Sequence, residues 1–388
     1  MKKTLSSLAI VATILALVVL NTSVAVDAAK LPNDPYLSEQ WGWFDIHADK
    51  AYASGYQGKG VVVAVLDTGV DLKHPDLKAN IVEGWNFVEN NNDTTDLDGH
   101  GTHVAGIIAA TANNGVGIAG IAPEAKIMPL KVLSESGGAW INLDKAILYA
   151  ANHGAKIISM SLGGQVTTVL SPTVLAAILI ASQKNVTIVA AAGNENTSTK
   201  SYPAAYPNVI AVSAISQNHT RASFSNYGNY IAFSAPGVKI LSTMPTYPVT
   251  LTSQYGFSED YDYLSGTSMA CPFVSGVVAL LLSKHPNLTP KMVKDTLAAQ
   301  AMDLGEKGWD LHFGYGIPDA YMAVTGIPIP EFTDMSILLL VSTVALFMII
   351  SDRKTGKEPQ ATKAPLVKTE TRPRSLEEWQ RIGAPTIK

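Results

Sequence analysis

Apolar runs of strand length alternate with helical patterns through the middle of the chain. Residues 61–66 (VVVAVL) form a continuous β-branched run, which is typical of a strand buried on both faces of a sheet. Three similar runs follow, at 156–160, 186–191 and 209–212. Helical patterns lie between and after these runs, at 143–152, 174–184, 268–283 and from residue 289 onward. This alternation predicts an α/β fold, a doubly wound, mostly parallel sheet with helices on both faces.

An apolar run near the start of the chain predicts an export signal. Two lysines precede a mainly apolar run at 8–20, and small residues follow near Ala25 and Ala28. This order of charged, apolar and small-residue regions is that of a secretory signal peptide, which we assign to residues 1–28. An uncleaved N-terminal anchor is the alternative interpretation.

A second apolar run, at 335–350, carries no charge and is followed by a basic segment. The run is somewhat shorter than the roughly 20 apolar residues that span a bilayer, and flanking residues or local thinning can supply the difference. We therefore predict a linker at 327–334, a transmembrane helix at 335–350 and a basic, disordered tail at 351–388. The excess of Lys and Arg after the run places the tail in the cytoplasm and residues 30–334 outside. A buried helix of a soluble protein is the alternative.

The charge of the chain argues against one class of partner, and its cysteine content excludes an internal disulfide. Residues 30–334 carry 26 Asp and Glu against 17 Lys and Arg, a net charge of −9, although the whole chain has a net charge of only −4. An acidic body argues against nucleic acid as a partner, because phosphate binding needs a basic face. Cys271 is the single cysteine, so no disulfide can form within the chain.

Three short segments carry residues suited to nucleophilic catalysis: 64–70 (AVLDTGV), 98–106 (DGHGTHVAG) and 264–272 (LSGTSMACP). Asp67 follows the first buried strand, His100 precedes a helix of small residues, and Ser268 opens the longest helix. A serine hydroxyl becomes a good nucleophile when a histidine removes its proton, and a buried carboxylate holds that imidazole in one tautomer. A helix that begins at Ser268 also directs free N–H groups toward a developing oxyanion.

Each motif has another interpretation when it is taken alone. Asp67 could be a turn former, Ser268 a helix N-cap, and His100 with His103 the metal pair of a metal hydrolase. The metal interpretation needs HExxH-like spacing or a further ligand, and the sequence offers neither. Taken together, the residues follow the chain order Asp, His, Ser, which is one of the known arrangements of the serine triad. A non-catalytic binding module with the same fold is the second alternative.

The chain resembles the subtilisin-like serine proteases (subtilases), in particular their thermitase-like branch. The similarity runs from about residue 32 to about residue 324 and rests on the three triad segments and three further blocks: 161–164 (SLGG), 190–195 (AAAGNE) and 202–212 (YPAAYPNVIAV). The resemblance implies that residues 29–326 form a serine endopeptidase domain that cleaves polypeptides through an acyl-enzyme. With the two hydrophobic ends, it predicts a peptidase anchored on the outer face of the membrane.

The resemblance also implies roles for residues around the triad. Asn194 corresponds to the asparagine of the oxyanion hole, and His103 to a second, structural histidine. An edge strand that pairs with an extended substrate is implied at Ser161, Leu162 and Gly163. Residues 190–192 and 202–205 resemble the walls of the pocket for the residue before the cut. No opposite charge is evident there, so we expect a large apolar or aromatic residue. The Tyr202–Pro203 peptide resembles a cis bond of the family, although sequence alone favours trans.

Calcium is the cofactor that the resemblance implies, and no organic cofactor is expected. Asp76 and Asn114 align with side-chain ligands of a tight calcium site, which loop carbonyls and Asp34 would complete. The stretch 90–98 (NNNDTTDLD) could hold a second ion or be a solvated acidic loop. The segment 241–263 is longer than its family counterpart and is either a neutral surface insertion or a cover over the site.

The C-terminal block also resembles an archaeal sorting signal of the PEF-CTERM type, in which a short motif and an apolar run precede basic residues. A sortase-like processing enzyme would then be a partner, and the peptidase would be released after processing. In that pattern the basic residues end the protein, whereas the chain here continues from Lys354 to Lys388. We therefore expect the helix to be retained.

Overall fold

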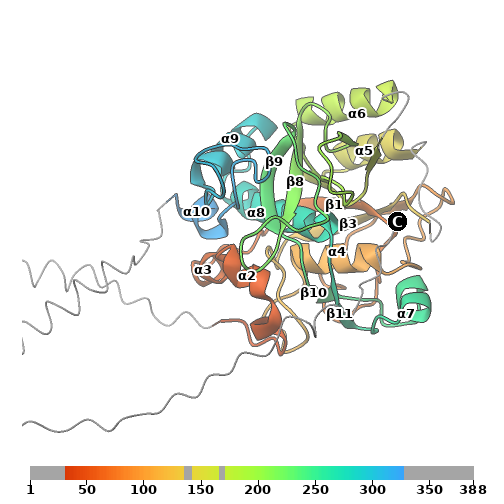
Figure 1. Ribbon diagram of the computed structural model, residues 1–388. Helices are drawn as coiled ribbons and strands as arrows, with labels where there is room; N and C mark the ends of the chain where they lie inside the picture. Colours follow the sequence, from red (N-terminus) through yellow and green to blue (C-terminus); the bar gives the residue numbers. More distant parts are fainter. Residues whose placement is uncertain (1–30, 135–141, 166–170, 327–388) are drawn as a thin grey trace, which may run out of the picture. The chain divides into compact units, whose positions relative to one another are not determined.

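A seven-stranded parallel sheet runs through the protein in the order β2-β3-β1-β4-β6-β8-β9. Figure 1 labels four of these strands, β1, β3, β8 and β9. Its strands are β1 (Val62–Asp67), β2 (Trp85–Asn86), β3 (Lys126–Lys131), β4 (Ile157–Met160), β6 (Thr187–Ala191), β8 (Val209–Ile215) and β9 (Ile231–Pro236). From β1 the chain moves outward to β3 on one side and to β4, β6, β8 and β9 on the other, so the predicted doubly wound topology is confirmed. Two antiparallel pairs complete the strands, β5 (Gly164–Gln165) with β7 (Ser201–Tyr202) and β10 (Ile240–Thr243) with β11 (Tyr261–Leu264).

The computed structural model describes residues 31–134, 142–165 and 171–326, which belong to one compact unit, Met1–Ile329. The predicted signal peptide 1–28, linker 327–334, transmembrane helix 335–350 and tail 351–388 lie outside the described residues and stay predictions.

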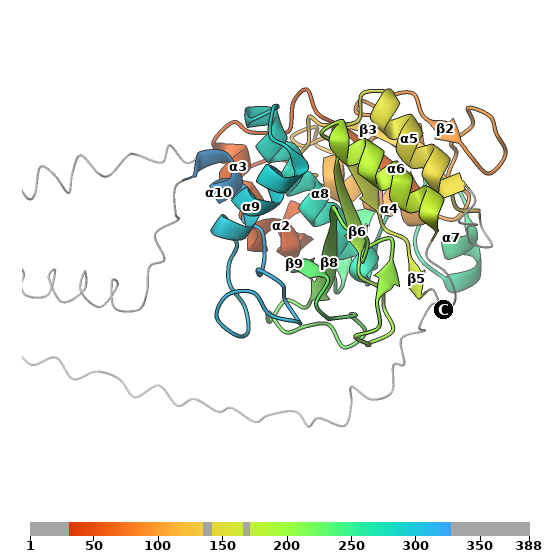
Figure 2. The ribbon, with the colours of Figure 1, turned by 90° about the horizontal axis from the view of Figure 1, so that it is seen from above.

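Helices cover both faces of the sheet (Figure 2). The helices are η1 (Leu37–Glu39), α2 (Trp41–Asp45), α3 (Ala48–Ala53), α4 (His100–Ala109), α5 (Leu143–Asn152), α6 (Pro172–Gln183), α7 (Thr250–Tyr255), α8 (Thr267–Lys284), α9 (Pro290–Gln300) and α10 (Ala320–Thr325). The four predicted helices are confirmed. The helix predicted at 174–184 begins two residues earlier because Pro172 follows an N-cap, Ser171, whose hydroxyl accepts from Val174 N–H.

Strand β1 contributes to two separate cores, one on each face of the sheet. Val63 and Val65 pack with apolar residues of α4 and α8, whereas Ala64 and Leu66 pack with those of α5 and α6. All four side chains are buried. Because both faces of β1 are covered, the strand is apolar from Val62 to Leu66 instead of alternating with polar residues.

Helix α8 is the central helix of the α4 face. Among the described residues it is the one helix long and apolar enough to cross a membrane, but 83% of that span is buried inside the protein. Such burial is that of a core helix. α8 packs against α4 and against strands β4, β6, β8 and β9, so its first turn is held firmly at the carboxyl edge of the sheet.

Candidate active site

The three predicted triad residues lie at the ends of elements that meet at the carboxyl edge of the parallel sheet. Asp67 is the last residue of β1, His100 is the first residue of α4, and Ser268 is the second residue of α8. Helix α4 packs against both β1 and α8. Ligands and substrates of doubly wound folds bind outside the carboxyl ends of the strands, where these residues lie.

The buried Asp67 side chain forms a short hydrogen bond with His100. His100 Nδ1 lies 2.7 Å from Asp67 Oδ1, and the Asp67 side chain is 1% exposed. Thr68 N–H donates to the same carboxylate oxygen at 2.8 Å. A carboxylate only accepts, so the proton of a neutral His100 sits on Nδ1 and Nε2 is left free to take a proton.

The charge around His100 makes it a stronger base than an ordinary histidine. Burial alone lowers the pKa of His100, but the negative charge and hydrogen bond of Asp67 outweigh it, and the charges of Asp98 and Asp96 add to them. Together they raise the pKa of His100 from 6.5 to about 9. The protonated imidazole is therefore well stabilised, as a general base requires.

Asp96 organises the start of α4, a role that the sequence motifs did not reveal. Its buried carboxylate accepts five hydrogen bonds at 2.6–3.1 Å, from Thr68 Oγ1, Asp98 N, Gly99 N, Thr102 N and Thr102 Oγ1. These bonds fix the turn that carries His100. Within the stretch 90–98, Asp96 is therefore a buried carboxylate whose oxygens are occupied by the protein itself.

Ser268 is held by a reciprocal pair of bonds with Ser161. The Ser268 hydroxyl donates to Ser161 O at 3.2 Å, and the Ser161 hydroxyl donates to Ser268 O at 2.7 Å. Within the described residues the Ser268 hydroxyl makes this bond and none to His100. A nucleophile–base bond often tightens only when substrate is bound, so this geometry is compatible with catalysis.

The Asn194 side-chain amide and the Ser268 main-chain N–H are two donors that lie close together. Thr267 N and Thr267 Oγ1 donate to Asn194 Oδ1 at 2.9 and 3.0 Å, which turns the NH₂ end of the amide outward. A Cβ placed on Gly266 would lie 3.6 Å from both Asn194 Nδ2 and Ser268 N, so these two donors flank the same space. Thr267 was not identified from the sequence, yet it sets the orientation of Asn194.

The predicted substrate edge follows β4 directly. Ser161 is buried, Leu162 is half-buried and Gly163 is exposed, and the three lie between β4 and β5 without belonging to either ladder. A Cβ on Gly163 would lie 2.9 Å from Tyr202 O, so a larger residue would push the edge away from β7. The Tyr202–Pro203 peptide is cis, as the resemblance implied and the sequence alone did not.

His103 is a packing residue, as expected. It is fully buried, and its Nε2–H donates to Ile240 O at 3.0 Å and Asp262 O at 3.2 Å. Burial, and then the charge of His100, lower the pKa of His103 to about 3, so it is neutral. The described residues contain no group of three or more His, Cys, Asp or Glu that could hold a metal.

The predicted calcium ligands lie together beneath Tyr261. Asn114 Nδ2 lies 2.7 Å from Asp76 Oδ1, while Ile118 N–H and the Tyr261 hydroxyl donate to Asp76 Oδ2 at 3.0 and 3.3 Å. Asp34 Oδ1 accepts from Asn114 N–H at 3.1 Å. Burial raises the pKa of Asp76 to about 6, and the charge of Asp34 contributes to the same shift. The two buried carboxylates offer the hard oxygens that Ca²⁺ prefers, and a cation would relieve their desolvation. The Asn114 amide directs its nitrogen at Asp76, and its oxygen accepts from a main-chain N–H of its own loop at 2.8 Å.

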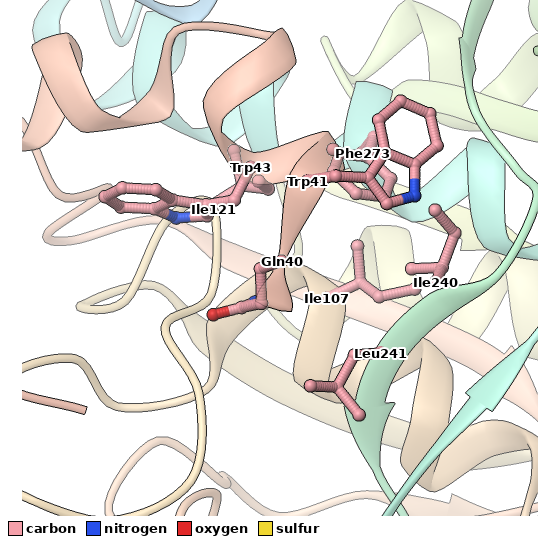
Figure 3. A pocket seen from close by; sticks show the side chains of 9 residues that line it. Gln40, Trp41, Trp43, Ile107, Ile121, Ile240, Leu241 and Phe273 are labelled. Atoms are coloured by element: carbon pink, nitrogen blue, oxygen red, sulfur yellow. The ribbon is translucent and has the colours of Figure 1, made fainter. Parts of the chain in front are cut away.

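A hollow between α2, α4 and α8 lies apart from these residues (Figure 3). Aromatic and aliphatic side chains line it, among them Trp41, Trp43 and Phe273. The amide of Gln40, its polar lining side chain, is already bonded to both Ala119 N and Ala119 O at 2.9 Å. The hollow therefore offers no polar side chain for a specific ligand.

The chain matches a known protein family and is similar in sequence and structure to known proteases. Residues 58–316 match the model of the subtilase family. Thermitase from Thermoactinomyces vulgaris is 46% identical over 255 residues, which cover 65% of this chain and 86% of thermitase. A thermophilic serine proteinase from Bacillus sp. strain AK1 is 41% identical over 301 residues, 77% of this chain and 70% of that protein. A solved protease structure from Pseudoalteromonas arctica, 33% identical, superposes with a TM-score of 0.70 over 76% of this chain and 99% of that one.

Proposed function

Because the chain belongs to the subtilase family of serine peptidases, we propose that it hydrolyses peptide bonds with Asp67, His100 and Ser268 as its catalytic triad. The observation that carries this proposal is the 2.7 Å bond between the buried Asp67 and His100, with Ser268 in the first turn of the adjoining helix. These three residues bring a base, its orienting carboxylate and a hydroxyl to one edge of the sheet.

The proposed chemistry has two stages. His100 Nε2 takes the Ser268 proton while Oγ attacks the scissile carbonyl carbon, and the tetrahedral intermediate then expels the amine, which receives that proton from His100. Water next attacks the acyl-enzyme, giving its proton to His100, and the acid product leaves as Ser268 is restored. Asp67 stays ionised and stabilises the imidazolium in both stages.

Asn194 Nδ2 and Ser268 N–H are the proposed donors to the oxyanion. The support is their common 3.6 Å distance from the Gly266 position and the two bonds from Thr267 that orient the amide. A preorganised donor stabilises charge only where it develops, in the transition state.

The proposed substrate is an extended polypeptide that pairs with Ser161, Leu162 and Gly163. Leu162 and Gly163 belong to no ladder in the described part of the chain, so they can form one with a substrate strand. We expect a large apolar or aromatic residue before the cut. Cleavage of a peptide library by the purified protein tests this preference.

Calcium is the proposed structural ion, held by Asp76, Asn114 and Asp34. When bound, it would neutralise the two buried carboxylates and stabilise the loop that carries Asn114. It takes no part in the peptide chemistry.

Export and membrane anchoring are proposed from the two hydrophobic ends of the sequence, 8–20 and 335–350. The catalytic domain would lie outside and the basic tail inside. Membrane fractionation followed by mass spectrometry of the C-terminus distinguishes a retained helix from release by a sortase-like enzyme.

Active-site labelling tests the proposed function. A fluorophosphonate probe should label the folded parent protein at Ser268, and Ser268→Ala should lose both labelling and casein hydrolysis. Ser265→Ala is the matched control, because Ser265 is an exposed serine shortly before Ser268 whose hydroxyl accepts from Lys239 N–H. A folded parent that takes no label would favour a binding module. Hydrolysis that survives phenylmethylsulfonyl fluoride would favour a metal hydrolase.

A further inference from the structure

The connection between β10 and β11, residues 244–260, lies against the loop that leads into His100. We refer to residues 244–260 as the brace. Figure 1 shows β10, β11 and α7 together beside α4, the helix that begins at His100. The sequence suggested a neutral insertion or a cover over the site, whereas the structure places this segment against the support of the histidine.

The brace bonds to every carbonyl of the short stretch 96–98. The Tyr247 hydroxyl donates to the carbonyl of residue 96 at 2.9 Å, Thr250 N–H to that of residue 97 at 3.1 Å, and Leu251 N–H to that of residue 98 at 3.0 Å. The next residues are Gly99 and His100. Loops outside secondary structure are ordinarily mobile, but a peptide whose carbonyl is bonded has a fixed plane.

The brace also packs on the residue just before the histidine. Gly99 has φ of 113°, and a Cβ there would lie 3.1 Å from Met244 Cε and 3.3 Å from Val249 Cγ2. At the start of the brace, Thr246 N and Thr246 Oγ1 donate to Asp71 Oδ2 at 3.0 and 2.8 Å. Apolar contact on one side and a buried carboxylate on the other therefore hold the brace in place.

We propose that the brace, and the Tyr247 hydroxyl in particular, positions the His100 imidazole for proton transfer with Ser268. The inference rests on the proposed function and adds to it a positioning residue far along the chain. The imidazole has one described side-chain bond, to Asp67, so its reach toward Ser268 depends on the backbone at 98–100. A misplacement of about 1 Å can cost about 10²-fold in rate.

Tyr247→Phe tests the inference in the full-length protein, with Tyr255→Phe as its matched control. Both substitutions remove one hydroxyl from the brace, but Tyr255 is 50% exposed and its hydroxyl has no described hydrogen bond. Fluorophosphonate titration counts the intact sites, so kcat is expressed per competent Ser268. We expect Tyr247→Phe to lower kcat about tenfold at unchanged KM. It should also shift the acid limb of the kcat/KM profile, while Tyr255→Phe leaves both at parent values.

Thr246→Val supplies a second variant, which removes the hydroxyl bond to Asp71 and keeps the bulk of the side chain. It should lower kcat in the same direction. The inference is overturned if Tyr247→Phe has the kcat and the pH profile of the parent. It is also overturned if the lost activity is explained by fewer titratable Ser268 sites or by unfolding. If the parent itself takes no fluorophosphonate, the proposed function fails, and this outcome is seen before any variant is compared.

Discussion

Ser161 and Ser268 exchange hydrogen bonds: each hydroxyl donates to the main-chain carbonyl of the other residue, at 2.7 and 3.2 Å. The reason lies one turn further along α8. In a regular helix the Ser268 carbonyl would accept from the N–H of residue 272, but Pro272 has none. The Ser161 hydroxyl satisfies that carbonyl instead, which ties the backbone of Ser268, the proposed nucleophile, to the proposed substrate edge.

Removal of this hydroxyl should therefore affect the nucleophile. Ser161→Ala leaves the Ser268 carbonyl unpaired and should lower the free energy of unfolding by about 1 kcal/mol. It should also reduce kcat, because Ser268 loses a constraint. Denaturant unfolding and steady-state kinetics measure the two effects. Ser283→Ala, at the far end of α8, removes a hydroxyl bonded to Leu280 O and should leave kcat unchanged. Equal kcat in both variants would contradict the prediction.

Asn194 should contribute to the transition state more than to substrate binding. Asn194→Leu removes the amide donor, and we expect kcat to fall by about 10²–10³ with little change in KM. Thr267→Val removes the hydroxyl bond to Asn194 Oδ1 but keeps the backbone one, so a smaller fall in kcat should result. Steady-state kinetics on a peptide substrate measure both. A rise in KM at constant kcat would indicate instead that Asn194 binds the ground state.

The sequence predicted the framework of the fold well because burial leaves a strong pattern. The run 61–66 is apolar throughout since both faces of β1 are covered, and Pro290 after Thr289 marks the start of α9 where the structure has it. Asp96 and Thr267 were missed because their importance comes from five and three hydrogen bonds whose partners no linear spacing reveals. The contacts of the brace were not predicted for the same reason, since they depend on the tertiary packing.

The pH dependence of activity should reflect the raised pKa of His100. Catalysis needs neutral His100, so kcat/KM should rise with pH through the pKa of about 9 instead of through 6.5. Asp67→Asn removes the main charge that raises it and should shift the acid limb to lower pH, with kcat lower by about 10⁴. The pH dependence of kcat and kcat/KM, expressed per site counted with fluorophosphonate, measures both the shift of the acid limb and the fall in kcat. An acid limb at or below pH 6.5 in the parent would contradict the assignment.

The Asp67–His100 pair should make the free energy of unfolding fall as pH rises, whereas it makes activity rise. A histidine whose pKa is raised by folding stabilises the protein fully below its unfolded pKa of 6.5, and this contribution is lost as pH rises through about 9. The parent should thus lose more stability than Asp67→Asn between these two values. Denaturant midpoints measured across that interval give the difference, and parallel curves for the two proteins would argue against the coupling.

Chelation should lower the thermal stability if calcium occupies the cluster at Asp76. A ligand that binds only the folded state raises Tm, so EDTA should lower the Tm of the parent. Asp76→Asn should have the lower Tm already and respond little to EDTA. Asp295→Asn is the control, because Asp295 is an exposed carboxylate bonded to Lys291 and lies outside both candidate ion sites. It should respond to EDTA as the parent does, and an equal EDTA response in Asp76→Asn would place the ion elsewhere.

Cys271 should be inert in the folded enzyme although it lies one turn after Ser268. The side chain is fully buried in α8, 3.6 Å from Ser159 Oγ, and burial raises the pKa of its thiol to about 11. Only the thiolate reacts with alkylating reagents, and near neutral pH this thiol is both protonated and inaccessible. Iodoacetamide should therefore leave the native protein unmodified and fully active, while urea-unfolded protein takes up one equivalent. Stoichiometric alkylation of the native protein with loss of activity would show that the first turn of α8 opens far more readily than its packing implies.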